Sequence, residues 1–323
     1  MKAFVAYRSP NTKDTWFLNT LCQDIKVASF VISPFQESED FHPFYFSGQP
    51  VSYQQERLVL TSDTDFVTPH SCLNNEYEQA FNNYIAAFEN KQASKAILSR
   101  IIAQPFDDNK LPQLFDALIK QRPDAFVYWF YHPKYGHWLG ATPEILLHQS
   151  NEQYKTVALA GTTFNNTSWT QKEKTEQQMV TDYVADCLRK QKITDYQTIG
   201  PEIIEAGPVK HLKTTFKWSQ PCEALELVEK LHPTPAICGL PKDAALALIL
   251  ANEKHQRAFY SGYLGPITQG KPQLYVNLRC MQQLDNMAYL YVGGGITIDS
   301  NLENEWKETS HKAQTLLGIM ENL

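Results

Sequence analysis

The sequence predicts an α+β fold, in which layered antiparallel sheets are flanked by helices. Short strand-like runs follow one another with only turns between them, and strands joined in this way pair antiparallel. Longer stretches with apolar residues three and four positions apart indicate helices. No change in composition divides the 323 residues. A single domain is therefore expected over 1–323, with an N-terminal sheet region at 1–84 and the main core at 85–323.

The elements of the first half can be assigned in order. Tyr77, Phe81 and Tyr84 share one face of a helix that is expected from Asn75 to about Lys91. The strand-like runs are bounded by turn residues. The full set is strands at 26–33 and 57–60, the helix at 75–91, a strand at 94–105, a helix at 112–120, and strands at 125–131, 137–140, 144–148 and 154–159.

A long helix from Gln171 to about Gln191 opens the second half. Thr170 and Glu173 have the spacing of a capping box at its start, and Val180 lies on its apolar face. The elements expected after it are strand-like segments up to 218, short helices at 222–230 and 242–251, strands at 259–267, 274–283 and 288–292, and a last helix.

Charge and cysteine usage narrow the class of protein. The formal net charge is −6, so no basic surface for nucleic acid is expected. The N-terminal residues carry no signal-peptide pattern, and no apolar run is long enough to span a membrane. The six cysteines are scattered without a CxxC pair, and the nine histidines lack zinc-ligand spacing. A cytoplasmic protein with reduced thiols is expected.

An acidic helix is expected to begin near Asn301, because Ser300 and Glu303 have the spacing of a capping box. Glu305, Glu308 and Lys312 are related by i, i+3 and i+7, so they share one face. Two carboxylates and one ammonium could hold a divalent cation together with an anionic substrate. The alternative is an ordinary i,i+4 ion pair between Glu308 and Lys312.

Two segments of small residues adjoin expected strands. Gly293-Gly294-Gly295 lacks the GxGxxG pattern of dinucleotide-binding proteins and predicts a close approach of the backbone to an anion. The alternative is a glycine bulge at a strand end. Gly161-Thr162-Thr163 is interpreted as a turn with free N–H and hydroxyl donors, or as a turn without a function.

Four charged residues are candidates for chemistry. Arg279 lies inside an expected apolar strand, where a guanidinium suits carboxylate binding. Lys95 opens a strand, and a desolvated lysine there could act as a base. Glu144 could be the complementary acid if burial raises its pKa, and Glu176 is a third candidate metal ligand. The alternative for each is a solvated charge.

The segment 231–241 contains three prolines and a glycine. Such a composition predicts a rigid, mostly apolar loop ahead of a helix. Rigid apolar loops make good walls for small-molecule pockets, although a purely structural connection is the alternative.

These segments, in this order, resemble the chorismate-utilising enzyme family over roughly residues 85 to 320. The family is a layered α+β fold of large antiparallel sheets around a buried pocket, and its members act on chorismate and need Mg²⁺. The matching motifs are LSR at 98–100, LGATPEILL at 139–147, ALAGT at 158–162, EKTEQQMV at 173–180, VKHLKT at 209–214, LHPTPAICGLPKDAAL at 231–246, RAFYSGYLG at 257–265 and GGGITIDSNLENEWKETSHK at 293–312.

The resemblance implies a role for each candidate and makes 85–323 the catalytic core. Lys95 is expected to be the base and Glu144 the acid. Mg²⁺ is expected among Glu176, Glu305 and Glu308, where it would bind the ring carboxylate of chorismate. The residues expected to contact the substrate are Gly161, Thr162, His211, Ala236, Tyr260, Arg279, Gly293, Gly294 and Lys312. Without the resemblance, His211 would be interpreted as a core residue.

The resemblance also favours one branch of the family. Lys95 is present and Ala160 is apolar, as in members that add water to chorismate, so an isochorismate synthase is expected. Salicylate synthase is the first alternative; an aminating subunit and a silent chorismate-binding module are the others. Two departures are Gln177, where this branch often has histidine, and the unmatched N-terminal region. A monomer without an obligatory protein partner is expected, serving menaquinone or siderophore biosynthesis.

Overall fold

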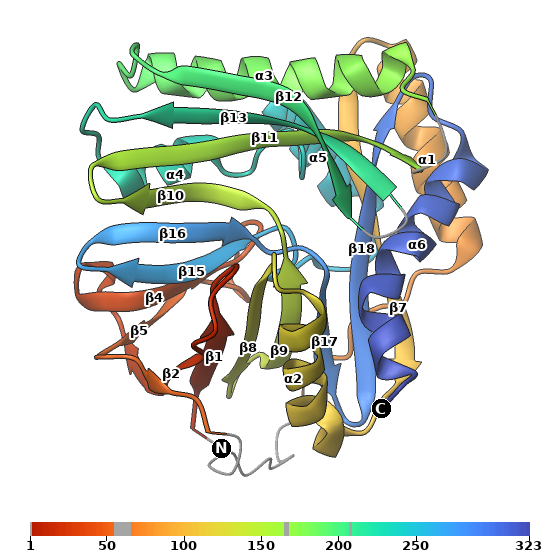
Figure 1. Ribbon diagram of the computed structural model, residues 1–323. Coiled ribbons are helices and arrows are strands. Elements are labelled where there is room, and N and C mark those ends of the chain that lie inside the picture. Colours follow the sequence, from red (N-terminus) through yellow and green to blue (C-terminus); the bar gives the residue numbers. More distant parts are fainter. Residues whose placement is uncertain (1, 55–65, 165–167, 207–208) are drawn as a thin grey trace.

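Two antiparallel sheets form the centre of the molecule (Figure 1). The computed structural model of the protein describes residues 2–54, 66–164, 168–206 and 209–323, and within these each sheet has nine strands. Sheet A runs in the order β14 (Gly239–Leu240), β7 (Lys95–Pro105), β18 (Met287–Thr297), β17 (Cys280–Leu284), β9 (Gly136–Thr142), β8 (Phe126–His132), β1 (Phe4–Arg8), β2 (Trp16–Leu18), β6 (Val51–Ser52). Sheet B runs β12 (Gln197–Ala206), β13 (Val209–Trp218), β11 (Gln153–Phe164), β10 (Ile145–Ser150), β16 (Lys271–Val276), β15 (Tyr263–Thr268), β4 (Ala28–Ser33), β5 (Phe44–Ser47), β3 (Thr20–Cys22).

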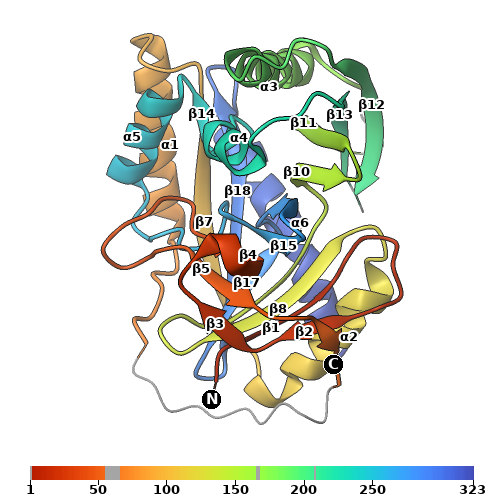
Figure 2. The same ribbon diagram turned by 90° about the vertical axis from the view of Figure 1, so that its left-hand side faces the viewer.

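Helices cover the outer faces of the two sheets (Figures 1 and 2). On sheet B lie α3 (Gln171–Lys190) and α4 (Ala224–Leu231). On sheet A lie α1 (Asn74–Glu89), α2 (Leu111–Gln121), α5 (Lys242–Asn252) and α6 (Leu302–Met320). The predicted α+β architecture of layered antiparallel sheets flanked by helices is therefore confirmed.

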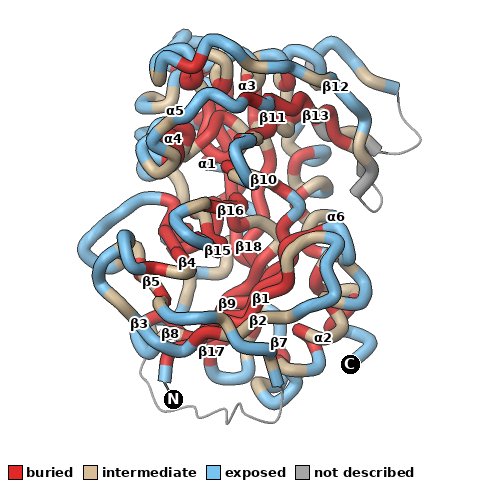
Figure 3. The backbone as a smooth tube through the Cα atoms, turned by 60° about the vertical axis from the view of Figure 1, so that its left-hand side comes forward, coloured by how far each residue is buried: buried red, intermediate tan, exposed pale blue. Residues whose placement is uncertain are grey.

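The main core fills the space between the two sheets. Phe30 of β4 and Phe126 of β8 are fully buried there, and the rings of Phe126 and Tyr275 stack with centroids 4.4 Å apart. Burial of each such side chain contributes about 1.5–3 kcal/mol. Figure 3 shows this buried interior and the exposed outer sides of the helices. The sheets are thus held face to face by aromatic packing.

The N-terminal region is part of both sheets. Val5 of β1 lies opposite Phe130 of β8, and Val31 of β4 lies opposite Gly265 of β15. The strand predicted at 26–33 is present as β4, preceded by a short 3-10 turn at Ile25–Val27. The strand predicted at 57–60 lies outside the described residues. Residues far apart in the chain therefore complete each sheet.

Most predicted elements are confirmed, but three predictions of local structure are wrong. The expected strand at 274–283 is two strands, β16 and β17, because the chain passes from sheet B to sheet A between them. The expected strand at 259–267 begins only at Tyr263, since Ala258 and Ser261 have φ of 50° and 60°. The expected turn at 161–163 is strand: β11 continues to Phe164, with an irregularity at Gly161.

Strand β18 is the longest partner of β7 and continues through the three glycines. Lys95 lies opposite Thr297, and Ser99 lies opposite Gly293. The glycine run is therefore paired along one edge and is not a bulge at a strand end. Within the described ranges, no helix combines the length and the apolar character needed to cross a membrane.

Candidate active site

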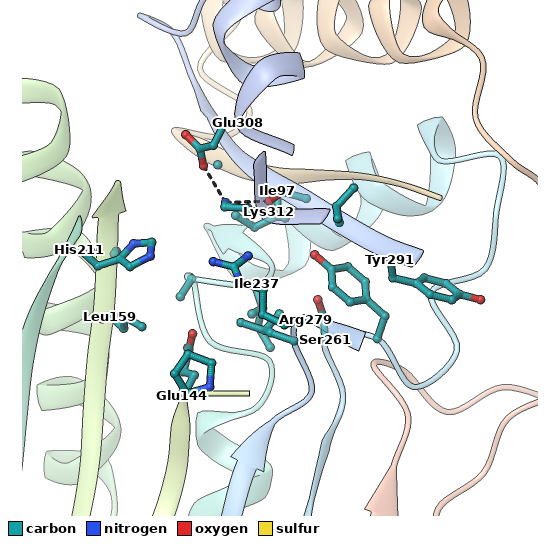
Figure 4. A pocket seen from close by; sticks show the side chains of 18 of the residues that line it. Ile97, Glu144, Leu159, His211, Ile237, Ser261, Arg279, Tyr291, Glu308 and Lys312 are labelled. Carbon is teal, nitrogen blue, oxygen red and sulfur yellow. Dashed lines mark hydrogen bonds and ion pairs between the residues drawn. The ribbon is translucent and has the colours of Figure 1, made fainter. Parts of the chain in front are cut away.

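A cavity lies where the two sheets meet, beside the glycine run of β18 (Figure 4). In Figure 4, Arg279 lies between Lys312 and Glu144, and His211 lies on the opposite wall. The lining residues are Ile97, Pro143, Glu144, Leu159, Ala160, Glu173, Glu176, His211, Ala236, Ile237, Tyr260, Ser261, Leu278, Arg279, Tyr291, Val292, Gly293, Gly295, Glu305, Glu308 and Lys312. Charged groups from both sheets and from two helices thus face one space.

Two of the charged groups lie where the chain changes sheets. Glu144 follows β9 of sheet A and precedes β10 of sheet B. Arg279 follows β16 of sheet B, precedes β17 of sheet A, and has φ of 50°. A non-glycine residue with positive φ is uncommon and marks a constrained position. The crossings explain why both side chains point into the junction and not along either sheet.

Glycine is required on the inner face of β18. A Cβ on Gly295 would lie 2.8 Å from Oε1 of Glu176 and 3.1 Å from Cε of Lys95. A Cβ on Gly293 would lie 2.8 Å from the hydroxyl oxygen of Tyr260. The two contacts at 2.8 Å are shorter than real Cβ atoms show and the one at 3.1 Å is tight, so the absence of side chains lets the cavity walls approach the strand. The predicted close approach at this run is of protein side chains.

Lys95 is fully buried, and its Nζ donates to Oε1 of Glu176 at 2.6 Å. The side chain of Glu176, on the second turn of α3, is 14% exposed. The interpretation of Lys95 as a solvated residue at a strand start is therefore wrong. A buried ammonium is tolerated because a carboxylate pairs with it. This ion pair joins β7 to α3 beside Gly295.

Glu144 is also buried, with 5% of its surface exposed. Burial raises the pKa of its carboxyl group to about 7, although Lys95, Arg279 and Lys312 oppose this by favouring the charged form. Among the described residues no cationic group lies within ion-pair distance of its carboxyl group. The desolvation of an unpaired carboxylate outweighs the more distant positive charges. Near neutral pH, Glu144 can therefore carry or release a proton.

The charged groups of α6 face the glycine run. Nζ of Lys312 lies 2.6 Å from Oε1 of Glu308 and donates to the carbonyl oxygen of Gly293 at 2.8 Å. Ser300 Oγ donates to Oε1 of Glu305 at 2.8 Å. The i,i+4 ion pair that was the alternative interpretation is therefore present, and Lys312 also bridges the helix and the strand edge.

The start of α6 differs from the expected capping box. Asn301 is the N-cap, and its side chain accepts from the backbone N–H of Asn304 at 3.1 Å. Ser300 instead turns to Glu305, and Glu303 pairs with Lys307 on the exposed face. The prediction placed the helix start correctly but assigned the cap one residue too early.

The three carboxylates predicted to hold a metal ion all line the cavity, and each is engaged with a protein donor. Glu176 pairs with Lys95, Glu305 accepts from Ser300, and Glu308 pairs with Lys312. Within the described residues, no three carboxylate, imidazole or thiol side chains converge closely enough to hold a metal. Their chemistry fits a hard cation, since carboxylate oxygens are the ligands that Mg²⁺ prefers.

The other walls of the cavity combine a tyrosine, a histidine and the proline-rich loop. Tyr260 is 4% exposed, its ring stacks on Tyr291 at 5.7 Å, and burial raises its pKa to about 12. Burial, together with Arg279 and Lys312, lowers the pKa of His211 to about 3, so this imidazole is neutral at physiological pH. Ala236 brings the loop 231–241 to the cavity.

Gly161 and Gly294 lie just behind the lining residues. Gly161 has φ of +70°, and a Cβ there would lie 2.7 Å from the carbonyl oxygen of Glu173. Gly294 faces α6, where a Cβ would lie 3.1 Å from Oε2 of Glu305. Thr162 belongs to β11 opposite His211, and its side chain lies outside the described residues. Each glycine allows a helix to approach a strand of the site.

Several lining residues were not singled out from the sequence. Ile97 stands two positions after Lys95 on β7, and Tyr291 stands two positions before Gly293 on β18. Side chains two apart on a strand face the same side, so this periodicity could have identified both. No local pattern marks Ser261, because its position depends on a turn with positive φ.

Comparison with known proteins adds sequence relatives to this geometry. The profile of the chorismate binding enzyme family matches residues 47–321. Isochorismate synthase EntC of Escherichia coli (strain K12) is 30% identical over 261 residues, which are 75% of this chain and 66% of EntC. Isochorismate synthase DhbC of Bacillus subtilis (strain 168) is 33% identical over 198 residues, 56% of this chain and 50% of DhbC. The matches therefore span between half and two thirds of these relatives.

Solved structures share the fold over nearly the whole chain. DhbC from Bacillus anthracis, described as a 2,3-dihydroxybenzoate-specific isochorismate synthase, superposes with a TM-score of 0.83 and 22% identity, covering 99% of this chain and 96% of its own. MenF, the menaquinone-specific isochorismate synthase from Escherichia coli, superposes with a TM-score of 0.80 and 18% identity, covering 99% of this chain and 89% of its own. The family profile covers most of the sequence, and the fold agrees with it. The chain therefore belongs to the chorismate binding enzyme family.

Proposed function

We propose that this protein is an isochorismate synthase, which converts chorismate to isochorismate by adding water at C2 and releasing the C4 hydroxyl. The strongest support is a pair of buried groups: Glu144, which lines the cavity and has a pKa of about 7, and Lys95, which pairs with the lining residue Glu176. A carboxyl group with this pKa can donate a proton at neutral pH, which a leaving hydroxyl requires. The names of the relatives EntC and DhbC agree with this activity.

In the proposed reaction, Lys95 in its neutral amine form removes a proton from a water molecule that attacks C2 of the ring. The two ring double bonds shift, the C4–O bond breaks, and Glu144 protonates the departing hydroxyl so that it leaves as water. One alcohol replaces another, so the reaction is reversible. The cavity walls exclude bulk water from both groups, because Lys95 and Glu144 are buried.

Chorismate carries two carboxylates, and the cavity offers cationic and polar partners for them. Arg279 and Lys312 would bind the enolpyruvyl carboxylate together with Tyr260 and the main chain at Gly293. A guanidinium can bind a carboxylate through two parallel hydrogen bonds. Neutral His211 would orient the ring carboxylate as a hydrogen-bond partner and not as a charge.

We also propose Mg²⁺ as the cofactor. Glu176, Glu305 and Glu308 would hold it, and when bound it supplies positive charge that neutralises the ring carboxylate. Chelation with EDTA should then abolish turnover, and added Mg²⁺ should restore it. Ca²⁺ in place of Mg²⁺ is the matched control for charge alone, because it is larger and prefers more oxygen ligands.

The experiment that tests the function is incubation of the purified protein with chorismate and Mg²⁺, with the products separated by chromatography. Isochorismate should form with the wild type and disappear with K95A. Salicylate and pyruvate as the main products would replace the proposal with a salicylate synthase. No turnover unless ammonia is supplied would contradict water addition altogether.

We place the product in menaquinone or siderophore biosynthesis and propose that the protein acts as a monomer without a partner subunit. Of the named structures, MenF is described as menaquinone-specific and DhbC as 2,3-dihydroxybenzoate-specific. Turnover by a single purified chain that elutes at monomer size would support a monomer that needs no partner subunit. Rescue of a menaquinone-deficient strain, but not of a siderophore-deficient one, would favour menaquinone biosynthesis.

A further inference from the structure

A buried ion pair lies outside the cavity, at the edge of sheet A. Glu253 directly follows α5, and Arg257 comes four residues later; both side chains are 2% exposed. Nη2 of Arg257 lies 2.6 Å from Oε1 of Glu253, and Nε lies 2.8 Å from Oε2. Burial of two charges is favourable only when further hydrogen bonds satisfy them. The hydrogen bonds that Glu253 and Arg257 make to other segments therefore indicate the structural role of the ion pair.

The ion pair completes the hydrogen bonds along the outer edge of β7. The edge strand β14 contains only two residues, so it leaves later backbone groups of β7 without a strand partner. Nη2 of Arg257 donates to the carbonyl oxygen of Ile97 at 2.8 Å. The backbone N–H of Ser99 donates to Oε1 of Glu253 at 2.8 Å. The side chains of Arg257 and Glu253 thus take the place of a strand partner for β7 beyond the end of β14.

Arg257 also reaches two other parts of the chain. Its Nη1 donates to the carbonyl oxygen of Ile237 at 2.8 Å, in the proline-rich loop. Its own carbonyl oxygen accepts from the backbone N–H of Tyr260 at 2.9 Å. Ile97, Ile237 and Tyr260 come from three separate segments, and all three line the cavity. The guanidinium therefore holds two parts of the cavity wall through their main chains, at Ile97 and Ile237, and the backbone carbonyl of the same residue holds the third, at Tyr260.

The turn that carries Tyr260 needs such support. Ala258 and Ser261 have φ of 50° and 60°, a conformation that persists only when surrounding contacts determine it. Arg257 holds the start of the turn. Its other end is held by the backbone N–H of Ser261, which donates to the carbonyl oxygen of Asn277 at 2.8 Å. Loss of the Arg257 contacts would release one end of this turn.

We propose that Arg257, held in place by Glu253, is a positioning residue that sets the wall formed by Ile97, Ile237 and Tyr260 for substrate binding. The inference deepens the proposed function and rests on it in one respect, that the substrate is chorismate. Arg257 touches neither the cavity nor the proposed reacting groups. Its loss should therefore weaken substrate binding more than it slows the chemical step.

The test compares two conservative substitutions of buried arginines. In R257K, an ammonium keeps the charge opposite Glu253 but has three N–H donors on one atom, so it cannot replace the four hydrogen bonds that the planar guanidinium makes to Glu253, Ile97 and Ile237. The matched control is R8K: Arg8 is 1% exposed, and its Nη1 donates to the carbonyl oxygen of Pro123 at 2.6 Å, beyond the end of α2. Arg8 does not line the cavity, so its substitution changes stability alone.

Thermal unfolding, kcat and KM for chorismate are measured for both variants. Both should unfold at a lower temperature than the wild type. R257K should raise KM by about tenfold or more with kcat changed by less than about threefold, because small displacements of binding groups have effects of this size or larger. R8K should leave both constants unchanged. An R257K variant that loses only stability, as R8K does, would overturn the proposal.

Hydrogen exchange gives a readout that does not depend on turnover. The amides of Ser99 and Tyr260 should exchange faster in R257K and in E253Q than in the wild type, and they should be unchanged in R8K. Faster exchange without a rise in KM would also overturn the positioning role. A wild-type protein that does not turn over chorismate would contradict the proposed function, and the exchange rates would then decide on the Arg257 contacts alone.

Discussion

Glu144 and Glu176 line the same cavity in opposite surroundings. Glu144 lies where the chain crosses between sheets, has no ion-pair partner among the described residues, and has a pKa raised to about 7 by burial. Glu176 lies on α3 and meets the ammonium group of Lys95 at 2.6 Å. The comparison teaches that two carboxyl groups of one cavity differ in their direct contacts as well as in their burial: one is desolvated without an ion pair, and the other faces a cation.

This difference separates two uses of one residue type. A carboxyl group without a cation is suited to exchanging a proton, whereas a carboxylate that already faces a cation is suited to holding another one. The same contrast extends to Glu308, whose Oε1 lies 2.6 Å from Nζ of Lys312. The predictions that follow remove either the isolated group or a partner of the paired ones.

The largest effect is expected on catalysis from the isolated group. E144Q should lower kcat by about 10²–10⁴-fold, the usual contribution of a general acid. Stability at pH 4 should change little, because there an amide replaces a protonated carboxyl group of the same shape that has no ion pair to lose. Steady-state kinetics and thermal unfolding check both points. E303Q, on the exposed face of α6, is the control and should keep wild-type kcat.

The next effect concerns the paired group and appears in stability. K95M leaves the Glu176 carboxylate without its cation, and breaking a buried ion pair costs about 3–5 kcal/mol. Because the Glu176 side chain is 14% exposed, the lower end of that range is expected. Denaturant unfolding measures the change. K95M/E176Q should regain most of the loss, and equal stability of the single and double variants would show that the ion pair is not the cause.

The protonation of Glu144 should also appear in the pH dependence of stability. The folded state binds this proton more tightly, since the pKa is about 7 against an ordinary value of 4.5. The protonated carboxyl group of Glu144 contributes fully to the free energy of unfolding below pH 4.5, and this contribution is lost as the pH rises through 7. It amounts to about 3 kcal/mol at 1.36 kcal/mol per pKa unit. The stability difference between wild type and E144Q, measured from pH 4 to 8, should fall in this window; a flat difference would contradict the raised pKa.

The smallest effect is expected at Glu305, which accepts a hydrogen bond from the hydroxyl group of Ser300. S300A removes the donor that lies 2.8 Å from Oε1 of Glu305. Loss of one such hydrogen bond should lower the free energy of unfolding by about 0.5–1.5 kcal/mol. S300T keeps the hydroxyl and should stay close to wild type. A loss as large as that of K95M would mean that Glu305 depends on Ser300 as strongly as an ion pair does.

The sequence predicts the regular elements of this molecule well because their signals are local. The helix expected at 75–91 is α1 at Asn74–Glu89, and the helix expected at 171–191 is α3 at Gln171–Lys190. The crossings between sheets could not be predicted in this way. Residues 274–283 form one apolar pattern, and only the packing of two sheets divides it at Arg279.

Local signals also failed for the environment of the charged groups. Lys95 opens a strand, where a lysine is usually solvated, and its partner Glu176 lies on a helix far along the chain. The family resemblance selected both residues, yet it did not imply that they form an ion pair. The burial of Glu144 likewise follows from its place between the sheets. The burial and the ion pairing of these charged groups therefore depend on contacts between distant segments, which local sequence patterns do not show.

The pairing of β7 with β18 has a consequence for how the protein is made. Lys95 lies opposite Thr297, so β7 obtains its main strand partner from a segment that is synthesised much later. Chains are synthesised from the N-terminus, and unpaired apolar strands are prone to aggregation. Between these two events Ala96, Ile97 and Leu98, all buried in the folded protein, have no β18 to pair with. Folding of sheet A is therefore completed after synthesis of β18, and chaperones that shield apolar segments have the whole of that interval in which to act on β7.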